Sequence, residues 1–357
     1  MKTAIILGAG ASKTEGAPLQ ADLFREFFRF ARHSMPNQDR MITDLSSFFH
    51  LVFGIDTFAR DLRGVDFPTF EEAIGILDLA ERRRESIRNF DLDNINRRFS
   101  YLRVLRQYLV LLLAKVIAKN LQKPAIHHRT LVRNLANSGH LRDTVFISTN
   151  YDILIDNALT GLYPQFSLDY GVEFTNFVKR NNWKRPRNRR VYLYKMHGSL
   201  NWLHCPTCNT LTLTPKEKGV IRVLTEGATC PECDSIIVPI IVPPTFYKDM
   251  SNAFLNMVWH KAEQSLSGVS QILICGYSLP DADMHIKYLL KRIQTNRRAP
   301  LSITVFNHFR RKSTEEIDAE KHRFFRFLGT DVNYTKLSFQ EFAQHPSKYY
   351  TNRRTGT

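Results

Sequence analysis

Four of the five cysteines form two Cys-x-x-Cys pairs, a spacing that is typical of a metal site. The pairs are Cys205 with Cys208 and Cys230 with Cys233, and 21 residues separate them. Two such turns can hold four thiolates around Zn²⁺ at Zn–S distances of about 2.3 Å. Because four sulfurs close the coordination shell, we expect a structural zinc ion that stabilises a short ribbon.

A second group of chemically capable residues follows short apolar segments. The run at 3–7 ends in Gly8-Ala9-Gly10-Ala11-Ser12, Asn150 and Asp152 follow the run at 144–148, and His197 follows the run at 191–196. Small residues after a strand let backbone N–H groups approach a diphosphate. An Asn supplies a fixed amide, an Asp an acceptor, and a His a base with an ordinary pKa of about 6.5.

Two later segments end in the same way. Gly276-Tyr277-Ser278 follows the run at 271–275 and Asn307 follows the run at 301–306, where they could reach ribose hydroxyls and an adenine edge. Because ligands collect at the carboxyl ends of parallel strands, we expect all these residues to converge on one cleft. Taken singly, Asp152 could instead be a helix N-cap, His197 a core residue, and Ser278 and Asn307 turn residues.

The elements that must position these residues alternate along the chain. Predicted strands lie at 3–7, 144–148, 191–196, 271–275, 301–306 and 332–337. Predicted helices lie between several of them, at 251–266, 283–294 and 312–328. This alternation predicts an α/β fold with a Rossmann-like, mainly parallel sheet that helices cover on both faces.

Residues 19–139 contain helical patterns and no convincing strand, which predicts an all-helical insertion. Seven apolar residues share one helical stripe, at 95, 99, 102, 105, 109, 112 and 116. The stripe could be the core of the insertion or could also pack against another subunit. The predicted organisation is a Rossmann-like domain in three parts (1–18, 140–200 and 238–345), the helical insertion (19–139), a zinc ribbon (201–237) and a disordered basic tail (346–357).

The composition narrows the class of protein. Of 357 residues, 43% are hydrophobic and 24% charged, which excludes wholesale disorder. The apolar stretch at 108–114 is too short for a bilayer, and the apolar start stops at Gly8, short of a secretory signal, so we expect a soluble, cytoplasmic protein without a membrane partner. The net charge of +16 favours polyanions, either nucleic acid or a phosphate-bearing cofactor.

In order and spacing, these motifs resemble the NAD-binding core of the sirtuin family, in its bacterial sirtuin-like branch. The resemblance covers about residues 1–18, 140–250 and 268–310. It consists of a G-A-G-x-S turn, an N-x-D and an H-G after two strands, a zinc cysteine eight residues after the histidine, and a later G-Y-S turn and strand-end Asn. The resemblance implies NAD as substrate and Zn²⁺ as a structural ion.

The resemblance also implies a role for each residue. Asn150 would place the attacking group beneath the ribose, Asp152 would bind the nicotinamide carboxamide, and His197 would take a proton. The remaining residues of the NAD site would hold the diphosphate (Gly8, Ala9, Gly10, Ser12) and the adenosine half (Gly276, Tyr277, Ser278, Asn307).

The chain departs from the protein deacetylases of the family at the acyl-peptide groove. The deacetylases have a G-I-P-D-F-R segment after the glycine turn, and the Asp and Arg of this segment are missing from Gly16-Ala17-Pro18-Leu19-Gln20-Ala21. Thr149 stands in place of the Gln that precedes their catalytic Asn. Val242-Pro243-Pro244-Thr245-Phe246 stands where their V-x-F-G-E strand clamps the acyl-lysine peptide. We therefore expect an NAD⁺ glycohydrolase that releases nicotinamide and ADP-ribose. The resemblance implies anti-phage defence by NAD depletion, restrained by homo-oligomerisation or by a partner such as a HerA-like ATPase.

Two alternatives remain. The chain could be a nucleic-acid-binding protein with a degenerate pocket, because Lys and Arg crowd one segment together with an aromatic residue, which suits a phosphate backbone and a stacked base. The segment contains Lys179, Arg180, Trp183, Lys184, Arg185, Arg187, Arg189 and Arg190. The second alternative is a protein deacylase, which the missing peptide clamp disfavours.

Overall fold

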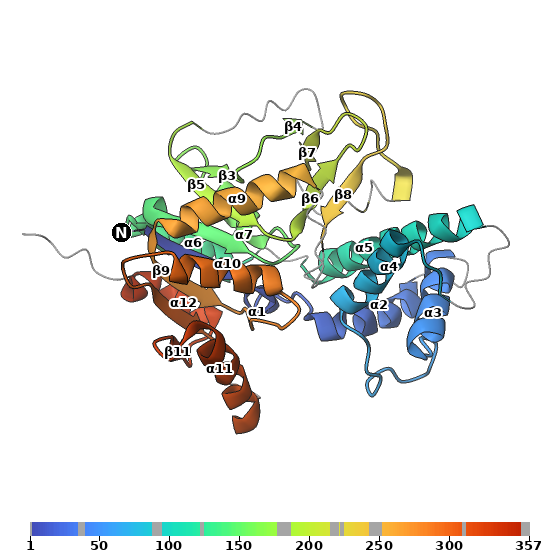
Figure 1. The fold of residues 1–357 in the computed structure, drawn as a ribbon, viewed down its shortest axis with the longest axis horizontal. Helices are drawn as coiled ribbons and strands as arrows, with labels where there is room; N and C mark the ends of the chain where they lie inside the picture. Colours follow the sequence, from blue (N-terminus) through green and yellow to red (C-terminus); the bar gives the residue numbers. More distant parts are fainter. Residues whose placement is uncertain are drawn as a thin grey trace, which may run out of the picture. The chain divides into compact units, whose positions relative to one another are not determined.

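The computed structural model describes residues 2–34, 40–87, 95–121, 125–176, 187–214, 221, 225–242, 252–308 and 312–350. The chain divides into two compact units, coloured by sequence in Figure 1. The sheet unit comprises Met1–Ala17, Lys123–Lys216 and Thr229–Thr357, and the helical unit comprises Pro18–Gln122 and Glu217–Ala228. Among the described residues, no helix is both long and apolar enough to span a bilayer.

A parallel sheet of seven strands forms the centre of the sheet unit, in the order β11-β10-β9-β1-β2-β5-β3. Its strands are β1 (Lys2–Leu7), β2 (Thr144–Ser148), β3 (Ser167–Asp169), β5 (Arg190–Lys195), β9 (Val269–Cys275), β10 (Ser302–Phe306) and β11 (Asn333–Thr335). All six neighbouring pairs run parallel. The predicted mainly parallel α/β fold is confirmed. The six predicted strands agree with the observed bounds to within two residues.

The strand register brings the predicted strand ends to one edge of this sheet. Leu7 at the end of β1 pairs with Ser148 of β2 on one side and with Cys275 of β9 on the other. The chain continues from β1 towards β2 and β5, whereas β9, β10 and β11 extend the sheet on the other side of β1. Such a reversal of strand order is where open α/β sheets bind ligands.

Helices of the sheet unit form two packed sets (Figure 1). One set contains α6 (His127–Asn137), α7 (Leu154–Thr160) and α12 (Phe339–Gln344), and the other contains α9 (Ala253–Ser267), α10 (Met284–Thr295) and α11 (Thr314–Leu328). Parallel crossovers are right-handed, so connections that run in opposite directions along the sheet place their helices on opposite faces. The three predicted helices are α9, α10 and α11, again within two residues at each end.

The sequence did not reveal the second, four-stranded sheet of this unit, in the order β4-β7-β6-β8. Its strands are β4 (Thr175–Asn176), β6 (Gly198–His204), β7 (Leu211–Leu213) and β8 (Val238–Ile241). β6 pairs antiparallel with both β7 and β8. It begins immediately after His197, so this sheet carries the chain from the edge of the parallel sheet to the cysteines.

The helical unit contains α2 (Gln20–Ser34), α3 (Arg40–Phe53), α4 (Phe70–Arg83) and α5 (Ile95–Asn120). On α5 the described residues of the predicted stripe are all at most 4% exposed, namely Leu102, Leu105, Leu109, Leu112 and Val116. These five side chains are the core of the unit and are not a surface for another subunit. The stripe positions 95 and 99 have side chains outside the described part of the chain.

Helix α6 lies inside the predicted insertion 19–139, but it packs with α7 and α12 of the sheet unit. The helical unit also includes Glu217–Ala228, from the segment that we predicted as zinc ribbon. The domain boundaries themselves stay a prediction.

Candidate functional site

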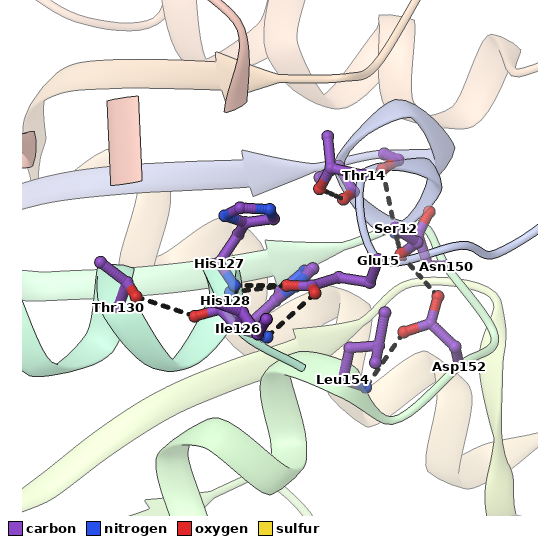
Figure 2. Close-up of polar contacts among 12 residues, drawn as sticks. Ser12, Thr14, Glu15, Ile126, His127, His128, Thr130, Asn150, Asp152 and Leu154 are labelled. Atoms are coloured by element: carbon purple, nitrogen blue, oxygen red, sulfur yellow. Dashed lines mark hydrogen bonds and ion pairs between the residues drawn. The ribbon is translucent and has the colours of Figure 1, made fainter. Parts of the chain in front are cut away.

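Three predicted site residues form one hydrogen-bonded cluster at the carboxyl edge of the parallel sheet (Figure 2). The Nδ2 of Asn150 donates to the Oγ of Ser12 at 2.9 Å and to the backbone O of Gly8 at 3.0 Å. The Oγ of Ser12 in turn donates to the Oδ2 of Asp152 at 2.7 Å. Ser12 and Asp152 are buried, at 2% and 5% exposure. The cluster ties the turn after β1 to the loop after β2.

Asp152 is not the N-cap of α7, which is Ile153, but its carboxylate does accept a hydrogen bond from the start of this helix. Its Oδ1 accepts the N–H of Leu154, the first residue of α7, at 3.0 Å (Figure 2). The two carboxylate oxygens therefore have different partners, one in the helix and one in the cluster. These two hydrogen bonds fix the side chain in a single orientation, which suits a residue that must present an acceptor to a ligand.

The glycine turns after β1 and β9 pack backbone against backbone. The N–H of Gly10 donates to the O of Gly276 at 2.8 Å, and Gly276 has a φ of 64°. A Cβ atom at Gly276 would lie 2.2 Å from the N of Ala11, so only glycine fits there. The N–H of Ala11 donates to the O of Gly8. The N–H of Gly8 donates to the O of Cys275, so three N–H groups of this turn already have backbone acceptors.

His197 follows β5 and lies beside the loop that carries Asn150. The N–H of Met196 donates to the O of Ser148 at 2.9 Å, and the rings of Tyr151 and His197 are 6.4 Å apart. The imidazole is 2% exposed. Its Nε2 lies 3.3 Å from the Oδ2 of Asp283, which precedes α10. Sequence reasoning missed Asp283, which stands at the start of a predicted helix and resembles an ordinary cap.

Tyr277 was predicted to contact NAD, and its hydroxyl points to Asp283. The OH donates to the Oδ2 of Asp283 at 2.7 Å, the same oxygen that faces His197. Burial and the negative charge of Asp283 raise the pKa of Tyr277 well above its ordinary value. The phenol is therefore a neutral donor at physiological pH.

The structure does not bring Ser278 and Asn307 into the cluster of Ser12, Asn150 and Asp152. Ser278 is exposed, and Asn307 lies at the end of β10, two strands from β1. The Nδ2 of Asn307 donates to Glu320 and, at 3.2 Å, to the OH of Tyr334. Burial and the charge of Glu320 raise the pKa of Tyr334 above its ordinary range.

A buried ammonium contacts the backbone of the cluster, and no sequence pattern indicated it. Lys195 at the end of β5 has 0% exposure and donates to the backbone O of Asp152. Its Nζ lies 3.4 Å from the Oδ2 of Asp156, whose Oδ1 accepts the OH of Tyr170 at 2.6 Å. Lys195 thus fixes the backbone at Asp152 and adds positive charge beneath it.

Glu15 holds the turn after β1 against the start of α6 (Figure 2). Its carboxylate accepts the backbone N–H groups of Ile126, His127 and His128 at 2.6–3.0 Å, and the His128 ring at 3.1 Å. Burial raises the pKa of Glu15, but these hydrogen bonds outweigh it and lower the pKa to about 2. The ionised carboxylate supplies the N-terminal cap that the local sequence of α6 lacks.

The four predicted zinc ligands meet in space. Their Sγ atoms all lie within 4.8 Å of one another, with 3.5 Å between Cys205 and Cys233 and between Cys208 and Cys230. Sulfurs around a tetrahedral zinc ion are about 3.8 Å apart, given Zn–S distances of about 2.3 Å. The donor set of four sulfurs and its spacing therefore fit a structural zinc ion.

The two cysteine turns have the same backbone geometry. In the first, the N–H of Asn209 donates to the O of Cys205, and in the second the N–H of Asp234 donates to the O of Cys230, both at 2.9 Å. Asn209 and Asp234 both adopt a positive φ, at 55° and 57°. Burial raises the pKa of Cys230, but the Thr210 hydroxyl and nearby N–H groups lower it to about 6. The Thr210 hydroxyl also lowers the pKa of Cys208, but burial and the neighbouring sulfurs outweigh it and raise the pKa to about 11, so this thiol would lose its proton on binding the metal.

Part of the predicted basic segment lies outside the described residues, namely Lys179, Arg180, Trp183, Lys184 and Arg185. Arg187 and Arg189 are exposed. Arg190 lies 3.5 Å from Asp169 and stacks over the ring of Tyr192. The tail was predicted to be disordered from residue 346, but Pro346–Tyr349 form a 3-10 helix and Tyr350 is buried, with its OH 2.7 Å from the Oγ1 of Thr144. Residues 243–250 and 351–357 lie outside the described part of the chain.

Comparisons with solved structures return sirtuins over nearly the whole chain. A sirtuin studied for its substrate affinity is 15% identical, with a TM-score of 0.45, over 98% of this chain and 94% of that chain. Sir2Tm bound to a propionylated peptide and Sir2 with a p53 peptide and NAD⁺ are each 14% identical, with TM-scores of 0.42 and 0.43, over 97% of this chain and 92% of theirs.

No curated protein matches the sequence. The family model for the SIR2-like domain matches residues 144–328, which is more than half of the chain. This match includes the loop of Asn150 and Asp152, His197, the four cysteines and Asn307. The chain therefore belongs to the SIR2-like domain family.

Proposed function

We propose that the protein is an NAD⁺ glycohydrolase, which cleaves the bond between nicotinamide and ribose and releases nicotinamide and ADP-ribose. Membership of the SIR2-like family and the resemblance of the sequence motifs to sirtuins support NAD⁺ as the substrate. The observation that carries the proposal is the cluster of Ser12, Asn150 and Asp152, held together at the strand-order reversal of the sheet.

In the proposed reaction, water attacks C1′ of the nicotinamide ribose. The water oxygen bonds to C1′, and the C1′–N bond breaks with its electron pair going to nicotinamide. Asn150 holds the water, Asp152 binds the leaving carboxamide, and His197 takes the proton and passes it to solvent. Because the nicotinamide of NAD⁺ is already cationic, the site acts mainly by positioning and by stabilising positive charge on the ribose.

The rest of NAD⁺ would extend along the same edge of the sheet. Gly8, Ala9, Gly10 and Ser12 would hold the diphosphate, and Gly276, Tyr277, Ser278 and Asn307 would hold the adenosine half. Four of these residues would act indirectly, because the N–H groups of Gly8 and Gly10 donate to Cys275 and Gly276, and the side chains of Tyr277 and Asn307 donate to Asp283 and Glu320. The assignments rest on the sequence resemblance and are proposals.

Two prolines favour a hydrolase over a deacylase. Pro243 and Pro244 follow β8, in the part of the chain where deacetylases clamp an acyl-lysine peptide. Proline has no backbone N–H, so neither residue can donate to a peptide that adds as a neighbouring strand. Without a bound acyl-lysine peptide, water is the nucleophile that remains to attack the ribose.

Product analysis distinguishes the two activities. The purified protein is incubated with NAD⁺ alone and with NAD⁺ plus an acetyl-lysine peptide, and both products are quantified by chromatography. We expect nicotinamide and ADP-ribose in equal amounts without peptide, and the same rate with it. Nicotinamide release that requires the peptide and matches its loss of acetyl groups would instead identify a deacylase.

An unrestrained hydrolase would deplete the NAD⁺ of its own cell, so we also propose restraint by homo-oligomerisation or by a partner such as a HerA-like ATPase, in anti-phage defence. This wider role rests on likeness to the bacterial sirtuin-like branch. Light scattering during size-exclusion chromatography should show an assembly larger than one chain, alone or after mixing with such an ATPase. A monomer in both samples would contradict the proposed restraint.

A further inference from the structure

Asp283 joins two elements behind His197. It precedes α10, it is 1% exposed, and its Oδ2 faces the Nε2 of His197 at 3.3 Å. Tyr277, which directly follows the Gly276 turn after β9, donates its OH to the same oxygen at 2.7 Å. The three side chains therefore connect His197, two residues after β5, to the turn after β9 through one carboxylate.

The donors and acceptors of this group define the state of the imidazole. An ionised carboxylate only accepts hydrogen bonds, and the neutral phenol of Tyr277 already donates to it. The Nε2 of His197 must therefore carry a proton to be a favourable neighbour of the same oxygen. In the neutral ring this leaves the Nδ1 as the acceptor.

We propose that Asp283 is the positioning residue of His197: it fixes the Nε2–H tautomer, so that Nδ1 is the atom that takes the proton from the attacking water. Tyr277 holds the Asp283 carboxylate in place. This inference deepens the proposed function and rests on it for the identity of the water. A carboxylate behind a histidine also stabilises the imidazolium that forms when the ring accepts a proton.

The tautomer can be measured in the ligand-free protein. Nitrogen–proton correlation spectra of ¹⁵N-labelled protein distinguish Nε2–H from Nδ1–H, and loss of a signal in His197→Gln assigns the ring. We expect Nε2–H in the wild type and a shift towards Nδ1–H in Asp283→Asn, because the amide can donate to the ring nitrogen. Asp281→Asn is the matched control, since Asp281 is exposed in the same loop and pairs with Lys287.

Kinetics supply the second readout. In Asp283→Asn we expect kcat for nicotinamide release to fall by roughly 10²–10⁴-fold, the usual contribution of general-base catalysis, with KM for NAD⁺ changed by less than about 3-fold. Tyr277→Phe keeps the ring and removes only the donor, so its kcat should fall by about 2–10-fold. Asp281→Asn should match the wild type in both constants.

Each failure has its own meaning. If Asp283→Asn keeps the wild-type tautomer and kcat, the positioning role of Asp283 is wrong. If the wild type releases no nicotinamide, the proposed hydrolase is wrong, while the spectra still test whether Asp283 fixes the ring. Should Asp283→Asn fail to fold, Tyr277→Phe decides: an unchanged tautomer together with an unchanged kcat would overturn the role of the Tyr277–Asp283 pair.

Discussion

At the scale of single residues, a buried ion pair contacts the backbone of the candidate site. The ammonium of Lys195 and the carboxylate of Asp156 are 0% and 4% exposed, and they lie 3.4 Å apart. Burying two charges costs solvation free energy, and removing one partner leaves the other uncompensated. Lys195 also binds the backbone O of Asp152. The pair therefore couples the stability of the sheet unit to the geometry of the loop after β2.

Replacing Lys195 should destabilise the protein severely. Lys195→Met keeps most of the side-chain volume but removes the ammonium beside Asp156, so we expect the free energy of unfolding to fall by about 3–5 kcal/mol. Lys348→Met, at an exposed position, should change it by less than about 0.5 kcal/mol. Urea denaturation measures both variants, and equal losses would show that the buried pair has no special role.

The site residues that could be predicted from the sequence are those next to a recognisable sequence pattern. Ser12, Asn150 and Asp152 each follow a recognisable strand, so their convergence could be expected from the parallel sheet. Asp283, 86 residues from His197, and Lys195, 39 residues from Asp156, carry no local mark of their partners. A buried lysine at the end of an apolar run looks like any strand terminus until the fold brings a carboxylate to it.

At the scale of elements, the start of α6 depends on a residue from another segment. Ile126 precedes this helix, and its side chain cannot act as a cap. The first N–H groups of the helix are instead accepted by Glu15, which lies more than 100 residues earlier in the sequence. The helix pattern of 127–137 alone could not indicate this, because its capping group is not in the local sequence. The contact joins the turn that carries Ser12 to α6, which packs with α7 and α12.

Glu15→Gln should weaken the protein in a pH-dependent way. The folded pKa of about 2 lies below the ordinary 4.5, so the carboxylate stabilises the fold above pH of about 4.5 and loses this effect as the pH falls towards 2. At pH 7 we expect a loss of about 1–3 kcal/mol in the free energy of unfolding. The difference from wild type should shrink at pH 3, as measured by urea denaturation.

The exposed Glu232 supplies the control for this substitution. Glu232→Gln should unfold like the wild type at both pH values, because substitutions at exposed positions usually change stability little. A Glu15→Gln protein as stable as Glu232→Gln at pH 7 would mean that the carboxylate does not stabilise α6.

The cysteine turns form a second element that can be tested directly. Metal analysis of the purified protein should give about one zinc ion per chain, and Cys230→Ser should lose it, because a hydroxyl is a poor replacement for a thiolate. Cys275→Ala is the matched control, since this buried thiol lies in β9, away from the four ligands. Zinc that persists in Cys230→Ser, or that disappears in Cys275→Ala, would contradict the assigned ligands.

At the scale of the whole molecule, the sequence predicted the parallel sheet but not the second sheet. Apolar runs that alternate with helices indicate parallel strands directly. β6 is buried along almost its whole length and β7 is three residues long, so neither shows the alternation of a half-exposed strand. The helical unit was predicted by its stripe, but the place of α6 in the sheet unit depends on tertiary packing.

The net charge of +16 makes a separate prediction for the whole chain. We expect weak, non-specific binding to duplex DNA at 50 mM salt that falls at least about 10-fold at 200 mM salt, because cationic side chains release counterions from the phosphates. Fluorescence anisotropy with a labelled duplex measures it, and Asn150→Ala should bind equally well. DNA binding that Asn150→Ala abolishes would link nucleic acid to the candidate active site instead.

The rate of nicotinamide release from NAD⁺ by the wild type, Asn150→Ala and His197→Ala tests the central claim most directly. We predict measurable release by the wild type and a loss of at least roughly 10²-fold in each variant, with the fold intact by circular dichroism and zinc still bound. Wild-type turnover in either folded variant would contradict the roles assigned to these two side chains.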